Sequence, residues 1–323
     1  MRRNRPSPSG LTPADVVVLL FVVLAALLFA IMGLSRSRES ARLAMCQNNL
    51  AQIGKALAYY DDAFGGLPYV GDPTPIQSPA ELAPPSPLRV MLEALGVASF
   101  LGLDPEGGNL PSLRAPTPEG GVIAGFLCPA DARATGGLFN SPGSYRATSG
   151  SEPGGVDGPF APGRKMSSSQ VERRDGTSFT AAFSERLVGT GRDEEAPENY
   201  RIAEVPADPL QDSPSPSGVP WRGDAGSNWR PADFRQTLYN HAVPPGWRTS
   251  LVAADGRSAS VGASSGHVRG VNVLMLDGSA KVVAPSIDLG VWRAYGSIGP
   301  EETSPPPGGP DATAEPPPLP ARK

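Results

Sequence analysis

The side chains best suited to redox, proton-transfer or metal chemistry are two cysteines, Cys46 and Cys128, and two histidines, His241 and His267. His267 is followed after nine residues by Asp277, and a histidine with a carboxylate is a common general acid–base pair. Two cysteines are too few for a four-thiolate zinc site, and two histidines offer little for a histidine-built centre. We therefore expect neither a metal nor another cofactor.

The spacing between His267 and Asp277 favours a structural role for both. Ten residues of strand cover about 33 Å at about 3.3 Å per residue, so the two side chains lie at opposite ends if the strand begins near His267. If the loop from 266 to 270 folds back instead, the two side chains can still form a site; this is the less favoured alternative. His241 lies in a proline-rich loop. The sequence contains no nucleophile elbow, phosphate loop or H-E-x-x-H motif, and we expect no enzyme.

A hairpin is predicted to position Asp277 and Gly278. Asp-Gly between two apolar runs is typical of a two-residue turn. In that register one face of the hairpin is wholly apolar and forms a seat for a helix; it consists of Val271, Val273, Met275, Ala280 and Val282.

One continuous helix from about Pro13 to about Ala63 is predicted to lie on that seat. Apolar or near-apolar residues recur at spacings of three and four, which makes one stripe on a helix. The stripe consists of Leu43, Cys46, Leu50, Ile53, Leu57, Tyr60 and Phe64. Gly65 and Gly66 are expected to end the helix.

Cys46 is on this stripe and Cys128 precedes Pro129 in a loop. In an oxidising compartment a disulfide between them would join helix to head and close a loop of about 80 residues, nominally worth about 4 kcal/mol. Two buried free thiols are the alternative.

The run from Val16 to Leu34 has nineteen residues without a charge, close to the roughly 20 needed to cross a bilayer. A cleaved secretory signal usually has a shorter apolar region and a small-residue cleavage site, whereas Ser35-Arg36-Ser37-Arg38 follows here. Arginines flank the run on both sides, so the charge rule leaves its orientation open. The lipid bilayer is an expected partner. The net charge of −4 argues against nucleic acid.

The residues Gly10-Leu11-Thr12-Pro13-Ala14-Asp15 precede the apolar run, and the segment resembles the leader of type IV pilins and type II secretion pseudopilins. The resemblance implies that a prepilin peptidase cuts after Gly10, that Leu11 is methylated, and that Asp15 acts in assembly with other pilin-like subunits. It also implies a cytoplasmic N-terminus and a head exported to the periplasm or cell surface. Thr12, Pro13 and Asp15 are equally typical of an ordinary capped helix start.

A second resemblance rests on five segments in order. They are Ala44 to Gly54, Cys128-Pro129-Ala130-Asp131, Ser144 to Gly150, Asp175-Gly176-Thr177-Ser178 with Ser184-Glu185-Arg186, and His267 followed by Asp277-Gly278. Together they resemble a large pseudopilin-like family of unknown function, abundant in planctomycete bacteria, with a C-terminal H-X9-DG signature. The resemblance covers roughly residues 10 to 296.

These observations predict an α+β, pilin-like fold: a long N-terminal helix, its first half transmembrane, packed on an antiparallel β-sheet head with long loops. The expected parts are a leader at 1–10, the helix at 11–65 with its membrane span at 16–34, the head at 66–299 and a disordered proline-rich tail at 300–323. The predicted protein is a membrane-anchored pseudopilin or minor-pilin-like subunit of a type II secretion or type IV pilus-like envelope assembly, in the cytoplasmic membrane.

Two alternatives stay open. One is a single-pass anchored module outside any filament, whose loops between Gly189 and Pro231 bind a surface polymer or protein. The other is a membrane-anchored hydrolase that uses His267.

Overall fold

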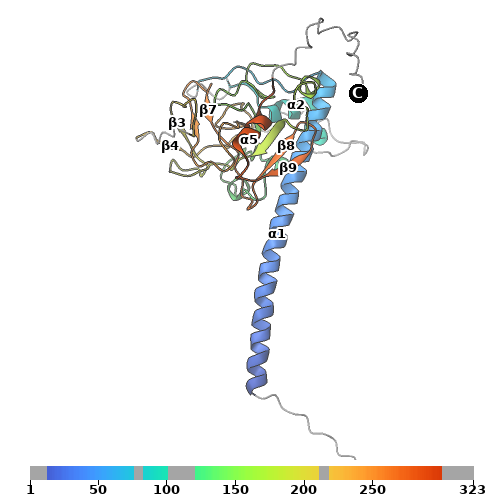
Figure 1. Cartoon of the computed structure of the whole chain (residues 1–323), viewed down its shortest axis with the longest axis vertical. Helices are drawn as coiled ribbons and strands as arrows, with labels where there is room; N and C mark the ends of the chain where they lie inside the picture. Colours follow the sequence, from blue (N-terminus) through green and yellow to red (C-terminus); the bar gives the residue numbers. More distant parts are fainter. Residues whose placement is uncertain (1–12, 76–82, 101–120, 211–217, 300–323) are drawn as a thin grey trace, which may run out of the picture.

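The computed structural model describes residues 13–75, 83–100, 121–210 and 218–299. A head domain packs on the C-terminal part of one long helix, and the rest of that helix stands clear of the head (Figure 1). The expected leader at 1–10, Leu11 and the tail at 300–323 lie outside the described residues.

The long helix is α1, Pro13–Phe64, whose 52 residues give it a length of about 78 Å at about 1.5 Å per residue. Pro13 opens it and Asp15 is in its first turn, where an acid interacts favourably with the helix dipole. It ends at Gly65, which has φ +70° and donates its N–H to the carbonyl of Asp61 at 2.8 Å. Its buried hydrophobic side chains are Cys46, Leu50, Ile53, Ala56 and Leu57.

The larger sheet has five strands in the order β5-β1-β2-β8-β9. These strands are β1 (Tyr145–Thr148), β2 (Ala181–Glu185), β5 (Leu238–Tyr239), β8 (Val271–Met275) and β9 (Ala280–Val283). β1 and β5 are parallel and the other neighbours are antiparallel. α1 contacts β8 and β9, and also α2, Pro87–Phe100. The helix thus covers the β8–β9 side of this sheet.

The smaller sheet has four short strands in the order β4-β3-β6-β7, with β3 and β6 parallel. They are β3 (Tyr200–Ile202), β4 (Trp221–Arg222), β6 (Leu251–Val252) and β7 (Ala259–Ser260). Figure 1 shows β3 and β4 on the side of the head away from α1. The remaining helices are η2 (Ala124–Phe126), α3 (Ala132–Thr135), α4 (Ser168–Glu172) and α5 (Leu289–Gly296).

The expected fold class is therefore wrong. The head is a mixed α/β arrangement of two sheets, each with a parallel pair, and not one antiparallel pilin-like sheet. The parallel pair was not predicted because β5 returns to β1 only after about 90 residues of chain. No local turn sequence indicates a pairing of such range. Within the described residues, no helix is both long enough and apolar enough to cross a membrane, contrary to the predicted transmembrane first half of the helix.

The hairpin register also differs from the prediction. Gly278 has φ +83° and donates its N–H to Met275 O at 3.0 Å, while Met275 N–H donates to Ser279 O at 2.8 Å. The loop therefore has three residues, 276–278, and the pairing moves by one position, with Leu274 opposite Ala280. A shift by one exchanges the two faces of a strand. Leu274 thus faces α1 on the same side as Ala280 and Val282, whereas Val271, Val273 and Met275 lie on the other face of β8.

Candidate functional site

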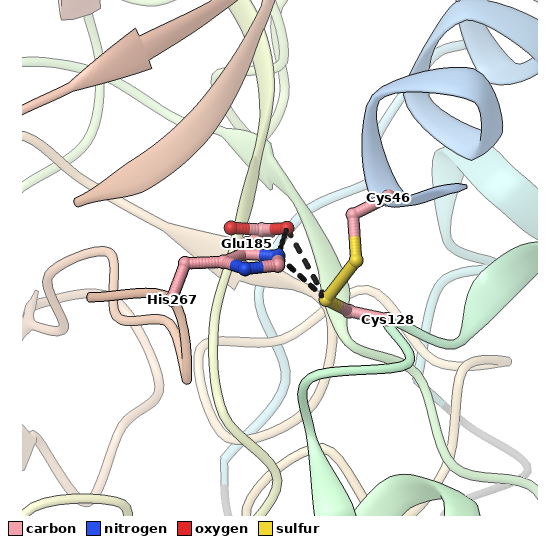
Figure 2. A group of neighbouring side chains, drawn as sticks. All are labelled: Cys46, Cys128, Glu185 and His267. Carbon is pink, nitrogen blue, oxygen red and sulfur yellow. Dashed lines mark hydrogen bonds and ion pairs between the residues drawn. A yellow bond between two sulfur atoms is a disulfide. The ribbon is translucent and has the colours of Figure 1, made fainter. Parts of the chain in front are cut away.

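A cluster of buried polar side chains lies where α1 meets the head. Cys46 of α1 and Cys128 of the head are joined by a disulfide that spans 82 positions of sequence, with their Cα atoms 5.1 Å apart. Figure 2 shows Glu185 and His267 beside Cys128, reaching it from different parts of the head. All four residues are buried. We refer to Cys46, Cys128, Glu185 and His267 as the Cys–Glu–His cluster.

Local backbone structure holds Cys128 toward α1. The carbonyl of Cys128 accepts the N–H of Asp131 at 2.9 Å, and the Asp131 carboxylate in turn caps α3. On the other side, Asn49 of α1 donates its side-chain N–H to Leu127 O at 2.9 Å. Asn49 lies about one helical turn after Cys46, so this hydrogen bond also holds Cys46 against the head.

Glu185 ends β2, and its carboxylate is held by Asn272 of β8. The Asn272 backbone N–H donates to Oε2 at 2.9 Å, and its side-chain amide donates to Oε1 at 2.8 Å. Oε1 also lies 3.3 Å from Cys128 Sγ. Burial raises the pKa of Glu185, although the hydrogen bonds from Asn272 favour the charged form.

His267 precedes β8 and lies between two carboxylates. Its Nε2 is 3.5 Å from Cys128 Sγ and 3.6 Å from Glu185 Oε1. Its Nδ1 is 2.7 Å from Glu39 Oε1, and Glu39 belongs to α1. The His267 side chain is fully buried, whereas that of Glu39 is 32% exposed. Through His267, the helix and the head are connected at a second point beside the disulfide.

The cluster can exist in two covalent states. In the disulfide, the sulfurs are bonded to each other and carry no proton or negative charge. Reduction would give two thiols, whose thiolate forms are nucleophiles and soft metal ligands. One potential ligand atom from each of the four residues lies within 4.8 Å of the others. A sulfur pair, an imidazole nitrogen and a carboxylate oxygen are the donors typical of zinc sites.

The structure brings some of the sequence-predicted residues together and separates others. Cys46, Cys128 and His267 meet in the cluster. Asp277 instead lies in the β8–β9 turn, where its carboxylate accepts the N–H of Ser279 at 2.8 Å. Gly278 follows in the same turn with φ +83°, and Asp15 lies at the far end of α1, in its first turn. Gly10 and Leu11 lie outside the described residues.

The second histidine, His241, is also buried but belongs to another network. Its Nδ1 is 2.6 Å from Trp292 O, and its Nε2 is 2.9 Å from the hydroxyl of Tyr239. Thr148 donates to that same hydroxyl at 2.9 Å. The carbonyl of Trp292 needs a proton on Nδ1, and the Tyr239 hydroxyl can donate to Nε2, which together describe a neutral imidazole. Burial accordingly lowers the pKa of His241 to about 3.

The two carboxylates of the site were not predicted from the sequence. Glu185 follows the apolar run Ala181-Ala182-Phe183 closely, and an acid inside a buried strand is a signal for a satisfied polar site. Glu39 lies seven positions before Cys46, which places both on one face of a helix. Neither signal alone would have paired these acids with His267.

Comparison with known proteins identifies the family without adding an activity. No curated protein and no solved structure shows detectable similarity to the chain. The family model described as "Protein of unknown function (DUF1559)" matches residues 35–290, which include all members of the Cys–Glu–His cluster and Glu39. Since this match covers well over half of the 323 residues, the chain belongs to the DUF1559 family.

Proposed function

We propose that this chain is a non-catalytic, pseudopilin- or minor-pilin-like subunit of a type II secretion or type IV pilus-like envelope assembly. The observation that carries the proposal is the apolar surface of the N-terminal part of α1. The Asp277 carboxylate is bound to its own turn, which argues against a catalytic pair with His267.

This surface extends around the whole helix. Nine consecutive residues from Val16 to Leu24 are apolar, and each is between 47% and 72% exposed. At about 100° per residue, nine positions cover every face of a helix. A helix that is apolar all round is typical of one buried on all sides. One groove on a partner would leave half of this surface in water, so the proposed occupants are the equivalent helices of several pilin-like subunits.

We propose that the unassembled subunit resides in the cytoplasmic membrane. The exposed apolar segment from Val16 to Leu27, about 18 Å long, would contact lipid there. The N-terminus would then be cytoplasmic and the head outside, in the periplasm or at the cell surface. A disulfide in the head fits an oxidising compartment of this kind.

Asp15 has a defined part in this proposal. If prepilin peptidase cuts after Gly10 and Leu11 is methylated, the new amine of a neighbouring subunit is a suitable partner for Asp15. Intact-mass analysis of the native protein tests the cleavage: a mass that retains Met1 would remove the pilin pathway and leave a simple anchor.

Assembly through the apolar surface is tested by Val18→Asp, with Ser40→Asp as the control. Val18 is 62% exposed and lies within the apolar surface, whereas Ser40 is an exposed polar residue of the same helix. A buried Asp in an apolar surrounding costs about 3 kcal/mol, so we expect recovery of high-molecular-mass complexes after cross-linking to fall at least about 10-fold for Val18→Asp alone. Equal recovery for both variants would contradict the proposal.

A second candidate, a surface-binding module, is favoured by an open pocket of about 590 Å³ at the C-terminal end of α1. Aromatic, basic and amide side chains line it, including Tyr60, Tyr69, Lys165, Gln170 and Arg173. Stacking rings with polar neighbours suit a sugar polymer or a protein loop. Retained binding of such a polymer by a Val18→Asp variant that no longer assembles would favour this candidate.

A further inference from the structure

We propose that reduction of the Cys46–Cys128 disulfide converts the Cys–Glu–His cluster into a zinc site. Its ligands would be the two thiolates, Nε2 of His267 and Oε1 of Glu185. This inference does not depend on the proposed assembly role, because the four ligands and their surroundings lie within the head and the part of α1 that packs on it.

Three distances already match a tetrahedral site. Cys128 Sγ lies 3.3 Å from Glu185 Oε1 and 3.5 Å from His267 Nε2, and these last two atoms are 3.6 Å apart. Zinc bonds of about 2.3 Å to sulfur and about 2.0–2.2 Å to nitrogen and oxygen place tetrahedral ligand atoms about 3.3–3.8 Å apart. One face of the tetrahedron is therefore present before any metal binds.

The fourth ligand needs a small movement. Cys46 Sγ is within 4.8 Å of the other three ligand atoms, but in the disulfide it is bonded to Cys128 Sγ. Once the bond is reduced, the two sulfurs must separate to roughly 3.8 Å for tetrahedral coordination. Rotation of the side chains suffices for this, because the packing of Leu50, Ile53 and Leu57 holds α1 against the head independently of the bond.

The surroundings orient these ligands as a zinc site requires. Zinc-bound histidines usually donate their other ring N–H to a carboxylate or carbonyl. Here Glu39 Oε1 lies 2.7 Å from Nδ1, which leaves Nε2 free to point at the sulfur. Asn272 holds the Glu185 carboxylate with two hydrogen bonds of 2.9 and 2.8 Å. The second layer is thus complete on both non-sulfur ligands.

The donor set selects the class of metal. Two thiolates and an imidazole suit zinc, whereas calcium and magnesium require mostly oxygen ligands. The site is buried, and four protein ligands would leave no position for water, so the zinc would be structural and not catalytic.

The conversion has a simple balance. A dithiol or phosphine reductant supplies two electrons, the sulfur–sulfur bond breaks, and two protons from water give two thiols. Binding of Zn²⁺ then releases these two protons as the thiolates form. A disulfide oxidant reverses the sequence and expels the metal. The protein would therefore hold its helix to its head by a covalent bond when oxidised and by a metal when reduced.

The test uses the full chain, reduced by a phosphine without oxygen, and titrated with zinc chloride against a chromophoric chelator. We expect one zinc per chain in the reduced protein and none in the oxidised protein. Cobalt substituted for zinc should show thiolate charge-transfer absorption together with the visible bands of tetrahedral cobalt. Reduced protein that takes up no zinc would overturn the proposal.

Variants separate this site from casual thiol binding. His267→Gln and Glu185→Gln each remove a ligand, and Glu39→Gln, at a partly exposed position, removes only the orienting carboxylate. We expect Glu39→Gln to weaken zinc binding about 10–100-fold. The matched control is Glu93→Gln, which breaks another 2.7 Å ion pair, with Arg89, away from the cluster. Unchanged affinity in Glu39→Gln and in both ligand variants would overturn the proposal even where one ligand variant folds poorly.

Discussion

Two buried titratable residues of the head are held in opposite ways. Glu185 is surrounded by donors from Asn272, whereas His241 is fixed by the carbonyl of Trp292 and the hydroxyl of Tyr239. The ring of His241 is also stacked on Trp292, with centroids 3.8 Å apart. Burial disfavours a charged ring here, and the Tyr239 hydroxyl can donate to an unprotonated Nε2, so the neutral ring is the form that suits this site.

His241 makes stability fall in mild acid. The unfolded histidine binds a proton below its ordinary pKa of about 6.5, whereas burial lowers the pKa of folded His241 to about 3. Between these values the unfolded state binds more protons, so the free energy of unfolding decreases as pH falls, by up to about 1.4 kcal/mol per pH unit from this group. His241→Gln should flatten this slope in urea titrations at pH 6.5, 5.5 and 4.5.

The comparison of slopes removes the effect of other groups. The raised pKa of Glu185 works in the opposite direction, because the folded state then binds the extra proton, but it is present in both proteins. A His241→Gln protein that loses stability as steeply as the parent would contradict the neutral assignment.

At the residue scale, the sequence showed which chemistry was possible but not which groups meet. The position of Cys46 on an apolar stripe and of Cys128 before a proline was enough to consider their pairing. The partners of His267 are Glu39, which is 228 positions away in the chain, and Glu185. Contacts of such range depend on how α1 docks, which no local spacing encodes.

At the element scale, two glycines determine how closely α1 approaches the sheet. A Cβ on Gly54 would lie 3.1 Å from Leu274 Cδ1 and 3.2 Å from the Cα of Gly278. The helix thus crosses directly over the Asp-Gly turn. The three-residue loop closes with φ +83° at position 278, a left-handed conformation that glycine adopts without steric cost.

Gly54→Val should destabilise the protein. The added side chain must displace the β8–β9 turn, and overpacking of this kind typically costs about 1–3 kcal/mol, more than the gain in helix propensity over glycine of under about 1 kcal/mol. The control is Ala58→Val, at an exposed position one turn later on α1. Urea midpoints provide the measurement, and equal midpoints for the two variants would show that the crossing is loose.

Elements with strong local signals were predictable, and their register was not. The stripe from Leu43 to Leu57 and the Asp-Gly turn both follow from short-range spacing. The turn contains one more residue than expected because Asp277 accepts from Ser279 and Gly278 adopts a left-handed conformation. That single residue put Leu274, and not Val273 or Met275, toward the helix.

At the scale of the whole molecule, the head is built from distant pieces of chain. β1 pairs with β5 through Ala147 and Leu238, and β3 pairs with β6 through Arg201 and Leu251. Both pairs are parallel, and parallel pairing requires a long connection whose partner cannot be read from a turn. This is why two mixed sheets were not foreseen.

The disulfide contributes to global stability by closing a loop. Cys46 and Cys128 are 82 positions apart, and the chain-entropy model gives about 4 kcal/mol for a loop of that size. We expect the double change Cys46→Ser with Cys128→Ser to lower the free energy of unfolding by up to that amount, measured in zinc-free urea titrations. Hydrogen exchange should accelerate first in α1 near residue 46, where the bond is lost.

A double-serine protein as stable as the parent would show that packing alone holds the helix. Chemical reduction of the parent, without metal, provides the control because it breaks the same bond and leaves both sulfurs in place.

The position of the Cys46–Cys128 bond also has a mechanical consequence. About 50 Å of α1 lies between Pro13 and Cys46, so a pull on the N-terminal end reaches the head at one covalent point before it reaches Leu50, Ile53 or Leu57. Noncovalent contacts that are loaded one after another peel apart at low force. Because the bond lies ahead of these apolar contacts, tension that breaks the Glu39–His267 contact passes through the bond into the head, and the apolar contacts behind it carry little of the load.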